Sequence, residues 1–362
     1  MPTRPGTVEG ALCTVDGYPG TMSGALVVWY AGLAAVGTGV IWKGSDLLER
    51  SSERLAAHYG MPPIVRGAVI AAVGSSFPEL SSTVLATLLH GQFDLGVGAI
   101  VGSAVFNILV IPAASALSHR RELSASRALV YKEAQFYMLA VSVLLLTFAF
   151  AVIYAPADGR PLTGTMTRPL ALVPVGLYAL YVFIQYQDVV DHDPGVAESV
   201  ALGRQWLRLI AGLALIVVAV EGLVRAAIGL GELFGTPSFV WGLTVIAAGT
   251  SLPDLFVSLR AAGEEEDGGV TSLANVLGSN TFDLLVAVPA GVLVAGTTTV
   301  DFAAAVPMMA ALTFATLVLF TLLRTELVLT NREAYTLLAV YGLFIAWVVL
   351  ETLGTVDLIP GA

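Results

Sequence analysis

Two short stretches place a proline and a carboxylate beside hydroxyl-bearing residues, inside otherwise apolar surroundings. They read GSSFPEL at 74–80 and GTSLPDL at 249–255. A proline lacks an N–H and its ring displaces the carbonyl four residues earlier, so each stretch would free one backbone oxygen, at Gly74 and at Gly249. In a membrane such an oxygen is tolerated only where it lines a polar cavity. The two stretches therefore predict two interrupted helices around a polar site.

Two further stretches repeat the pattern without proline, GSAVFN at 102–107 and GSNTFD at 278–283. Each sets a serine one helical turn before an amide or a carboxylate. Histidine and cysteine are absent from these stretches, so the predicted ligands are all oxygens, which suits a hard cation such as calcium better than zinc or copper. The candidate side chains are Glu79, Asp254 and Asp283, Asn107, and the hydroxyls of Ser75, Ser76, Ser103, Thr250, Ser251 and Ser279.

The composition of the chain predicts an all-α integral membrane protein. Of its 362 residues 56% are hydrophobic and 12% are charged, and the mean hydropathy is +0.83. A bilayer core about 30 Å thick needs roughly 20 apolar residues per helix. Ten such windows can be placed, at 24–42, 64–89, 95–117, 134–154, 168–186, 206–230, 238–262, 270–295, 302–323 and 336–354.

The chain also contains an internal repeat. The two proline stretches are separated by 249 − 74 = 175 residues, and the same offset carries Asp46 to Glu221. Each half then holds five predicted helices, and because five is odd the second half enters the membrane from the opposite side. Inverted repeats of this kind build secondary transporters, whose sites lie near the midplane at interrupted helices, here the second and the seventh. The expected divisions are a tail at 1–23, repeats at 24–186 and 206–362, and a short cytoplasmic linker at 187–205.

The basic residues predict how the chain lies in the membrane. With the N-terminus outside, 13 of the 17 Lys and Arg residues fall on the inner side. This distribution satisfies the positive-inside rule and predicts that both termini lie outside the cell membrane. The net charge of −10 makes nucleic acid an unfavourable partner. Cys13 is the single cysteine, which excludes an intramolecular disulfide and a cysteine metal site. The basic residues left outside are Arg4, Arg160, Arg168 and Arg225.

With its four stretches in this order, the chain resembles the cation/calcium exchanger superfamily, and specifically its prokaryotic sodium/calcium exchangers. The stretches correspond to that family's two alpha repeats, at 67–117 and 242–295. The resemblance implies an antiporter, not an enzyme, that works as a monomer without a cofactor and exchanges Na⁺ for Ca²⁺ by alternating access, with the first and sixth helices sliding across the rest.

The resemblance also implies roles for particular residues. Glu79 and Asp254 would be the central calcium ligands, and Asn107 and Asp283 would complete the sodium and calcium sites. The hydroxyls named above would contribute further ligands. Carbonyl ligands would come from Ala72 and Ala247, and a gating or access role is expected for Asp46 and Glu221.

Several alternatives stay open from the sequence. Aspartate at position 254 and the stretch GSNTFD are similar to the potassium-dependent branch, in which K⁺ travels with Ca²⁺. Calcium/proton exchange is less favoured, because that branch carries a Gly-Asn-x-x-Glu motif where this chain has GSSFPE. From other classes, a cation channel with the acidic cluster as its filter or a calcium receptor that moves no ion is conceivable. The acidic run GEEEDGG at 263–269 lacks the spacing of an EF-hand and is interpreted as a solvated turn.

Overall fold

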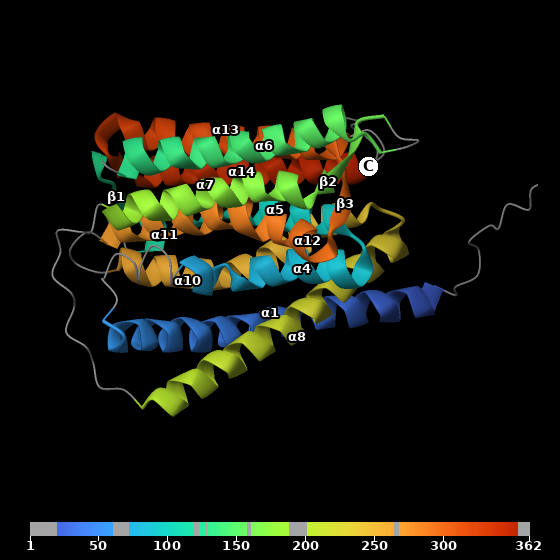
Figure 1. Cartoon of the computed structure of the whole chain (residues 1–362), viewed down its shortest axis with the longest axis horizontal. Helices are drawn as coiled ribbons and strands as arrows, with labels where there is room; N and C mark the ends of the chain where they lie inside the picture. Colours follow the sequence, from blue (N-terminus) through green and yellow to red (C-terminus); the bar gives the residue numbers. More distant parts are fainter. Residues whose placement is uncertain are drawn as a thin grey trace, which may run out of the picture.

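The computed structural model describes residues 20–60, 72–118, 123–127, 129–157, 161–187, 201–263 and 268–353. Most helices run along one long axis and form a bundle, from which α1 and α8 stand apart (Figure 1). The first half contains α1 (Gly20–His58), α3 (Ala72–Ser75), α4 (Phe77–His90), α5 (Phe93–Ser118), the π-helical turn η2 (Leu129–Glu133), α6 (Ala134–Tyr154) and α7 (Arg168–Gln187). The second half contains α8 (Leu202–Phe234), α9 (Ser238–Trp241), η3 (Gly242–Ile246), α10 (Ala247–Ala262), α11 (Gly268–Phe282), η4 (Asp283–Ala287), α12 (Val288–Ala295), α13 (Phe302–Glu326) and α14 (Asn331–Thr352).

These helices confirm the predicted membrane architecture. Within the described residues, nine helical segments are long and apolar enough to cross a bilayer. The span predicted at 238–262 coincides with Ser238–Ala262, and the span predicted at 168–186 with Arg168–Gln187. The second predicted span is represented by α3 and α4, and its first residues lie outside the described part of the chain. Residues 1–19 of the predicted tail, with Cys13, and most of the predicted linker also lie outside it, and α1 begins at Gly20, four residues before the first predicted span.

The two proline stretches interrupt their helices in different ways. In the first, α3 ends at Ser75, Ser76 forms a turn, and α4 begins with Pro78 in its first turn, as predicted. In the second, α10 continues through Pro253, and the irregularity is the π-helical turn η3 that comes just before it. A proline removes one hydrogen bond, which a helix held by its neighbours can lose without breaking, so the predicted break at Pro253 is replaced by the earlier π-turn.

The helix α5 forms the centre of the bundle. Its residues are apolar or small on every side, and most of them are buried, as expected for a helix surrounded by protein. Its glycines allow direct backbone contact: a Cβ on Gly102 would overlap the carbonyl oxygen of Leu243 in η3, and a Cβ on Gly242 would overlap that of Leu95. The two halves of the chain therefore meet backbone to backbone next to the predicted site.

The helices α1 and α8 form a separate crossed pair. They pack chiefly on each other, with Gly44 of α1 against the backbone of Gly212 and the side chain of Ile216 on α8. Much of α8 is exposed, and Figure 1 shows the pair along one side of the bundle. On the side of the bundle, α8 packs on α4 and α1 packs on α10.

Two short antiparallel ladders join the repeats at opposite ends of the bundle. The strand β1 (Leu123–Ser124) pairs with β4 (Val328–Leu329), and β2 (Thr163–Thr167) pairs with β3 (Thr297–Asp301). Each ladder takes one strand from each half of the chain. In Figure 1, β1 lies at the left end, and β2 and β3 lie at the right end.

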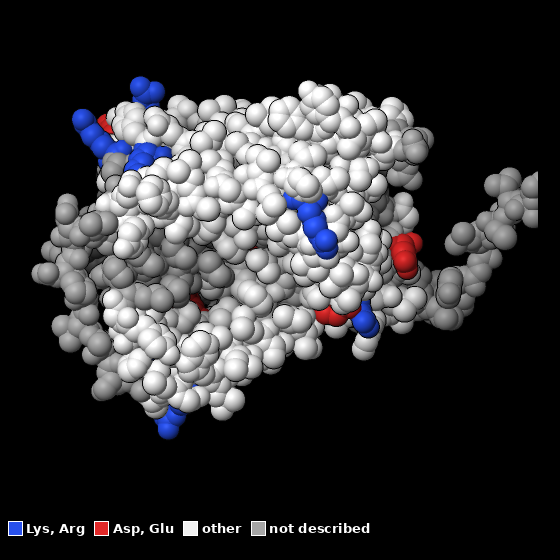
Figure 2. Space-filling view, in the orientation of Figure 1, with Lys and Arg blue, Asp and Glu red and all other residues white. Residues whose placement is uncertain are grey.

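The surface between these ends is largely uncharged. Figure 2 shows Lys and Arg gathered mainly at the left end of the long axis, with a broad white area over the middle of the bundle. Large apolar side chains such as Tyr154, Val218 and Leu343 are mostly exposed. An apolar belt between charged ends is what a bilayer requires of a spanning protein.

Candidate functional site

The fold brings the predicted site residues together in the middle of the bundle. Glu79 lies on α4, Asp254 on α10 and Asp283 at the start of η4. All three carboxylates are at most 1% exposed. The polar side chains predicted around them are also buried, namely Ser75, Ser76, Ser103, Asn107, Thr250, Ser251 and Ser279.

The hydrogen bonds in the site follow the internal repeat. Ser103 Oγ donates to Glu79 Oε1 over 3.3 Å, and Ser279 Oγ donates to Asp254 Oδ2 over 2.8 Å. Ser103 and Glu79 occupy the positions in the first half that Ser279 and Asp254 occupy in the second. Each central carboxylate is therefore held by a serine of its own repeat.

A second set of contacts joins the two repeats, and its members also occupy corresponding positions in the two halves. Ser251 Oγ donates to Ser103 Oγ over 2.7 Å, and Ser76 Oγ lies 2.6 Å from Ser279 Oγ. Thr250 approaches Glu79 from the opposite repeat, as Ser75 approaches Asp254. The Thr250 hydroxyl also lies 3.4 Å from the carbonyl oxygen of Ala247, at the start of α10, whereas Ala72 begins α3.

Asn107 breaks this symmetry. Its Nδ2 donates to Asp254 Oδ2 over 3.0 Å and to Asn280 Oδ1 over 3.1 Å, whereas the matching residue in the second half, Asp283, is a carboxylate. Asn280 in turn donates to the carbonyl oxygen of Ala104 and to Tyr137 Oη. Sequence reasoning missed Asn280, although it stands next to Ser279 in the same stretch.

Several buried oxygens in the site have no hydrogen-bond partner among the described residues. They are Glu79 Oε2, Asn107 Oδ1, Asp254 Oδ1 and both oxygens of Asp283. A buried charge that is neither paired nor hydrogen-bonded is costly, so these oxygens favour a bound cation or a proton. Within the described ranges, no three His, Cys, Asp or Glu side chains gather tightly enough to hold a metal alone. A bound cation would therefore take most of its ligands from hydroxyl, amide and carbonyl oxygens, as calcium and sodium readily do.

Asp283 lies on the side of the site that faces α6 and α7. Its carboxylate is close to the hydroxyl-bearing rings of Tyr137 on α6 and Tyr178 on α7. Tyr178 Oη is buried without a hydrogen-bond partner in the described part of the chain. Neither tyrosine was predicted, because nothing in their local sequence differs from that of an ordinary membrane helix.

The two acids assigned a gating or access role, Asp46 and Glu221, lie outside the cluster. Asp46 Oδ1 pairs with Arg50 on its own helix at 2.7 Å and with Arg260 of α10 at 3.9 Å. Glu221 pairs with Arg225 on its own helix and with His90 of α4. Their ion pairs join α1 and α8 to the helices of the site.

Glu49 is a further acid that the sequence analysis did not single out. Its backbone lies against Gly74, next to Ser75, and its carboxylate is near enough to Asp254 for the two charges to repel. Its spacing of three residues from Asp46, on the same side of α1, is the signal that could have identified it.

A profile of the family described as "Sodium/calcium exchanger protein" matches residues 29–187 and 204–350. The chain belongs to the sodium/calcium exchanger family. It is therefore a membrane transporter and not an enzyme, as the resemblance implied. The two matched segments correspond to its two halves.

Relatives agree with this assignment. The inner membrane protein YrbG of Escherichia coli is 30% identical over 70% of this chain and 76% of its own. The sodium/calcium exchanger MaX1 of Methanosarcina acetivorans is 25% identical over 66% of this chain and 75% of its own. A solved structure of the sodium-calcium exchanger NCX_Mj, soaked with Na⁺ and Sr²⁺, has a TM-score of 0.58 and 25% identity, covering 88% of this chain and 99% of its own.

Relatives of the potassium-dependent branch match less of the chain. Sodium/potassium/calcium exchanger 4 of mouse is 37% identical, but only over 34% of this chain and 18% of its own.

Proposed function

We propose that this protein exchanges Na⁺ for Ca²⁺ across the cell membrane at the cluster around Glu79 and Asp254. The proposal is supported by two buried carboxylates, each of which accepts a hydrogen bond from a serine of its own repeat and retains one unpartnered oxygen in the described residues. Hydroxyls from both repeats surround them. This arrangement offers a dehydrated cation the oxygen ligands that calcium prefers, and two negative charges to balance it.

Competition for the same oxygens would provide the coupling. Calcium needs Glu79 and Asp254 ionised and close together, whereas several sodium ions can spread over the same oxygens and those of Asn107 and Asp283. Ala72 and Ala247 would add backbone carbonyls. A tightly bound ion of one kind then displaces the other, and exchange follows if the empty site does not change sides.

Alternating access would come from movement of the α1–α8 pair against the bundle. The two helices pack on each other, and the pair passes the site where Thr38 and Leu223 lie against Gly249. A rigid pair sliding over a fixed site could open it to one side at a time.

We also propose that both termini face outward and that one chain suffices for transport. The inner ends of the helices then carry most of the basic residues. Both halves of the site come from a single chain, whereas ion channels usually build an acidic ring from several subunits.

Purified protein in sodium-loaded liposomes tests the proposal. Uptake of ⁴⁵Ca²⁺ after dilution into sodium-free buffer should require internal sodium, and Glu79→Gln should abolish it. A further need for internal potassium would place the protein with potassium-dependent exchangers. Uptake that ignores sodium would overturn the proposal, in favour of a channel if it follows voltage, or of proton exchange if it follows an imposed pH gradient.

A further inference from the structure

One ion-paired cluster lies away from the cation site, where α8 crosses the end of α4. Glu221 of α8 accepts from Arg225 Nε at 2.6 Å, and His90 Nε2 lies 3.1 Å and 3.2 Å from its two oxygens. Arg225 is on the same helix as Glu221 and moves with it. Among the described residues, His90 is therefore the partner of Glu221 that ties this point of α8 to the bundle.

The inverted repeat places a matching cluster on the other helix of the pair. The offset of 175 residues carries Asp46 to Glu221 and Arg50 to Arg225. In the Asp46 cluster on α1, the partner from the bundle is Arg260 of α10, which is 3.9 Å from Asp46. The acid and its arginine are thus repeated, but the bundle supplies arginine to one cluster and histidine to the other.

We propose that these clusters tether the α1–α8 pair to the helices of the cation site, and that external acid tightens the His90–Glu221 tether and slows exchange. The inference rests on the proposed function, because it assumes that α8 moves against α4 during transport. In this proposal, the gating role expected for Glu221 from the sequence consists in holding α8 to His90 of α4.

The chemistry of the two partners differs. Arginine stays charged at every physiological pH, whereas histidine changes charge between about pH 5 and 8. His90 stands in the last turn of α4, where the helix dipole favours a positive charge. A protonated imidazole would attract the Glu221 carboxylate more strongly than a neutral one, and the barrier to sliding would rise as the pH falls.

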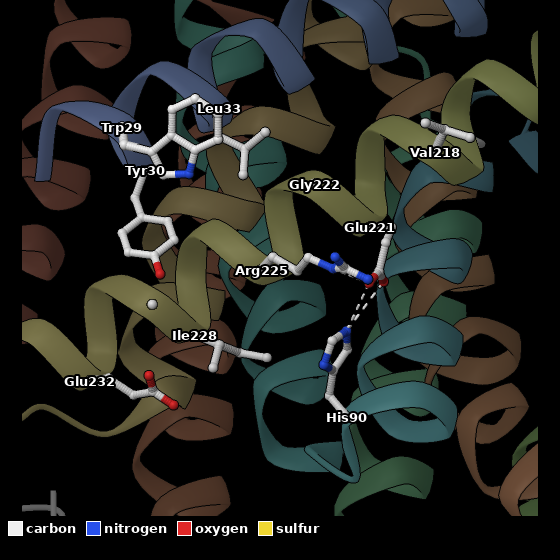
Figure 3. Close-up of a pocket in the computed structure, with 11 residues that line it drawn as sticks. Trp29, Tyr30, Leu33, His90, Val218, Glu221, Gly222, Arg225, Ile228 and Glu232 are labelled. Carbon is white, nitrogen blue, oxygen red and sulfur yellow. Dashed lines mark hydrogen bonds and ion pairs between the residues drawn. The ribbon is translucent and has the colours of Figure 1, made fainter. Parts of the chain in front are cut away.

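A cavity lies beside the tether. It has a volume of about 660 Å³ and is lined by Tyr30, His90, Glu221 and Arg225, with exposed Trp29 and Val218 at its surface. Figure 3 shows His90 and Arg225 both directed at Glu221, with the rings of Trp29 and Tyr30 entering from α1.

The other groups around the imidazole are compatible with this role. Glu232 lines the same cavity, and Asp94 lies in the first turn of the next helix, α5. From α1, Tyr30 lines the cavity. The helix α12, which also packs on α4, carries no charged residue. The acids that α10 and η4 bring to α4 are Asp254 and Asp283, which belong to the cation site near its other end.

The test compares the pH profiles of sodium-driven Ca²⁺ uptake in liposomes for wild type, His90→Gln, His90→Lys and His58→Gln. When the external pH is lowered from 8 to 6, the uptake rate should fall in the wild type and in His58→Gln by a factor about five times larger than in His90→Gln. His90→Lys should be slow at both pH values, because its charge is permanent. All four proteins keep the carboxylates of the cation site, so acid effects on those groups are common to every profile.

A second measurement follows the distance between α4 and α8 directly, independently of transport. Spin labels on exposed Leu89 of α4 and Leu215 of α8, in a Cys13→Ser background, would report by EPR how closely the helices approach. Acid should shorten the mean distance between the labels and narrow its distribution in the wild type, but not in His90→Gln. Equal pH profiles for wild type and His90→Gln, or a distance indifferent to pH, would overturn the tether and leave the exchange proposal standing. Loss of sodium-driven uptake in the wild type would instead contradict the exchange proposal.

Discussion

Asn107 of the first repeat donates a hydrogen bond to Asp254 of the second, with 3.0 Å between the amide nitrogen and the carboxylate oxygen. The matching position in the second repeat holds Asp283, which cannot donate while ionised. The two central carboxylates are thus related by the repeat but have different neighbours. Asn107 donates to Asp254, whereas the Glu79 carboxylate lies near the Asp283 carboxylate.

The substitution Asn107→Asp tests this contact. It replaces a donor to Asp254 by a like charge at about the same distance, and the variant should lose about tenfold in exchange rate. Uptake assays at matched protein density would measure the loss. Asn275→Asp, on α11 but bonded to Ser258 away from the carboxylates, is the matched control and should transport like the wild type. Equal losses in both variants would show that the contact has no specific role.

Neutralising either central carboxylate should stop transport. Removal of one charge from a buried ion pair costs about 3–5 kcal/mol, so Glu79→Gln and Asp254→Asn should each weaken Ca²⁺ binding by at least about 100-fold. Calorimetric titration of Ca²⁺ into purified protein measures this directly. Glu326→Gln, an exposed acid at the end of α13, is the size-matched control. Ca²⁺ binding that survives both site substitutions would place the calcium site elsewhere.

Lengthening the carboxylate at position 254 should change ion selectivity. Aspartate leaves more room between the two acids than glutamate would, and the size and flexibility of a site decide between cations of different radius. Asp254→Glu should therefore raise the ratio of Ca²⁺ to Sr²⁺ uptake several-fold. Parallel uptake of the two isotopes in one preparation gives the ratio. An unchanged ratio would mean that Asp254 does not set the width of the site.

Asp283→Asn should separate sodium binding from calcium binding. Both Asp283 oxygens lack hydrogen-bond partners in the described residues, and they lie on the Tyr137 and Tyr178 side of the cluster. Ca²⁺ uptake should persist in this variant but should need several-fold more internal sodium, because one sodium ligand loses its charge. A sodium titration of the uptake rate measures the shift. Complete loss of Ca²⁺ binding would instead class Asp283 with Glu79.

Two equivalent glycines should respond differently to the same substitution. A Cβ at Gly102 would overlap the backbone oxygen of Leu243, whereas a Cβ at Gly278 meets no atom within 4 Å. Gly102→Ala should therefore destabilise the protein by about 1–3 kcal/mol, as overpacking generally does, and Gly278→Ala should be tolerated. Thermal unfolding in detergent compares the two variants. A similar shift in both would contradict the close contact between α5 and η3.

The sequence alone indicated most of the residues that the fold brings together at the candidate site, because the repeat relates their positions. A constant offset implied that Ser76 and Ser251 play matching roles, and the fold gives each a serine partner across the repeat. Long apolar windows located the helices for a similar reason: the thickness of a bilayer fixes the length of a span, and the chain shows it without tertiary information.

Features that depend on contacts between distant helices were not predicted. Asn280, Tyr137 and His90 act through partners on other helices, and no local spacing identifies those partners. The form of the seventh helix was missed for a related reason. Pro253 predicts a break, but whether a helix breaks at a proline or shifts into a π-turn nearby depends on what packs around it.

Competition between the two ions at one site is the central claim, and Ca²⁺ titrations of the purified protein at increasing sodium concentration test it most directly. If Glu79 and Asp254 serve both ions, the apparent Kd for Ca²⁺ should rise steadily with sodium, and choline at the same ionic strength should have little effect. A calcium affinity that sodium leaves unchanged would contradict a shared site, and with it exchange by competition.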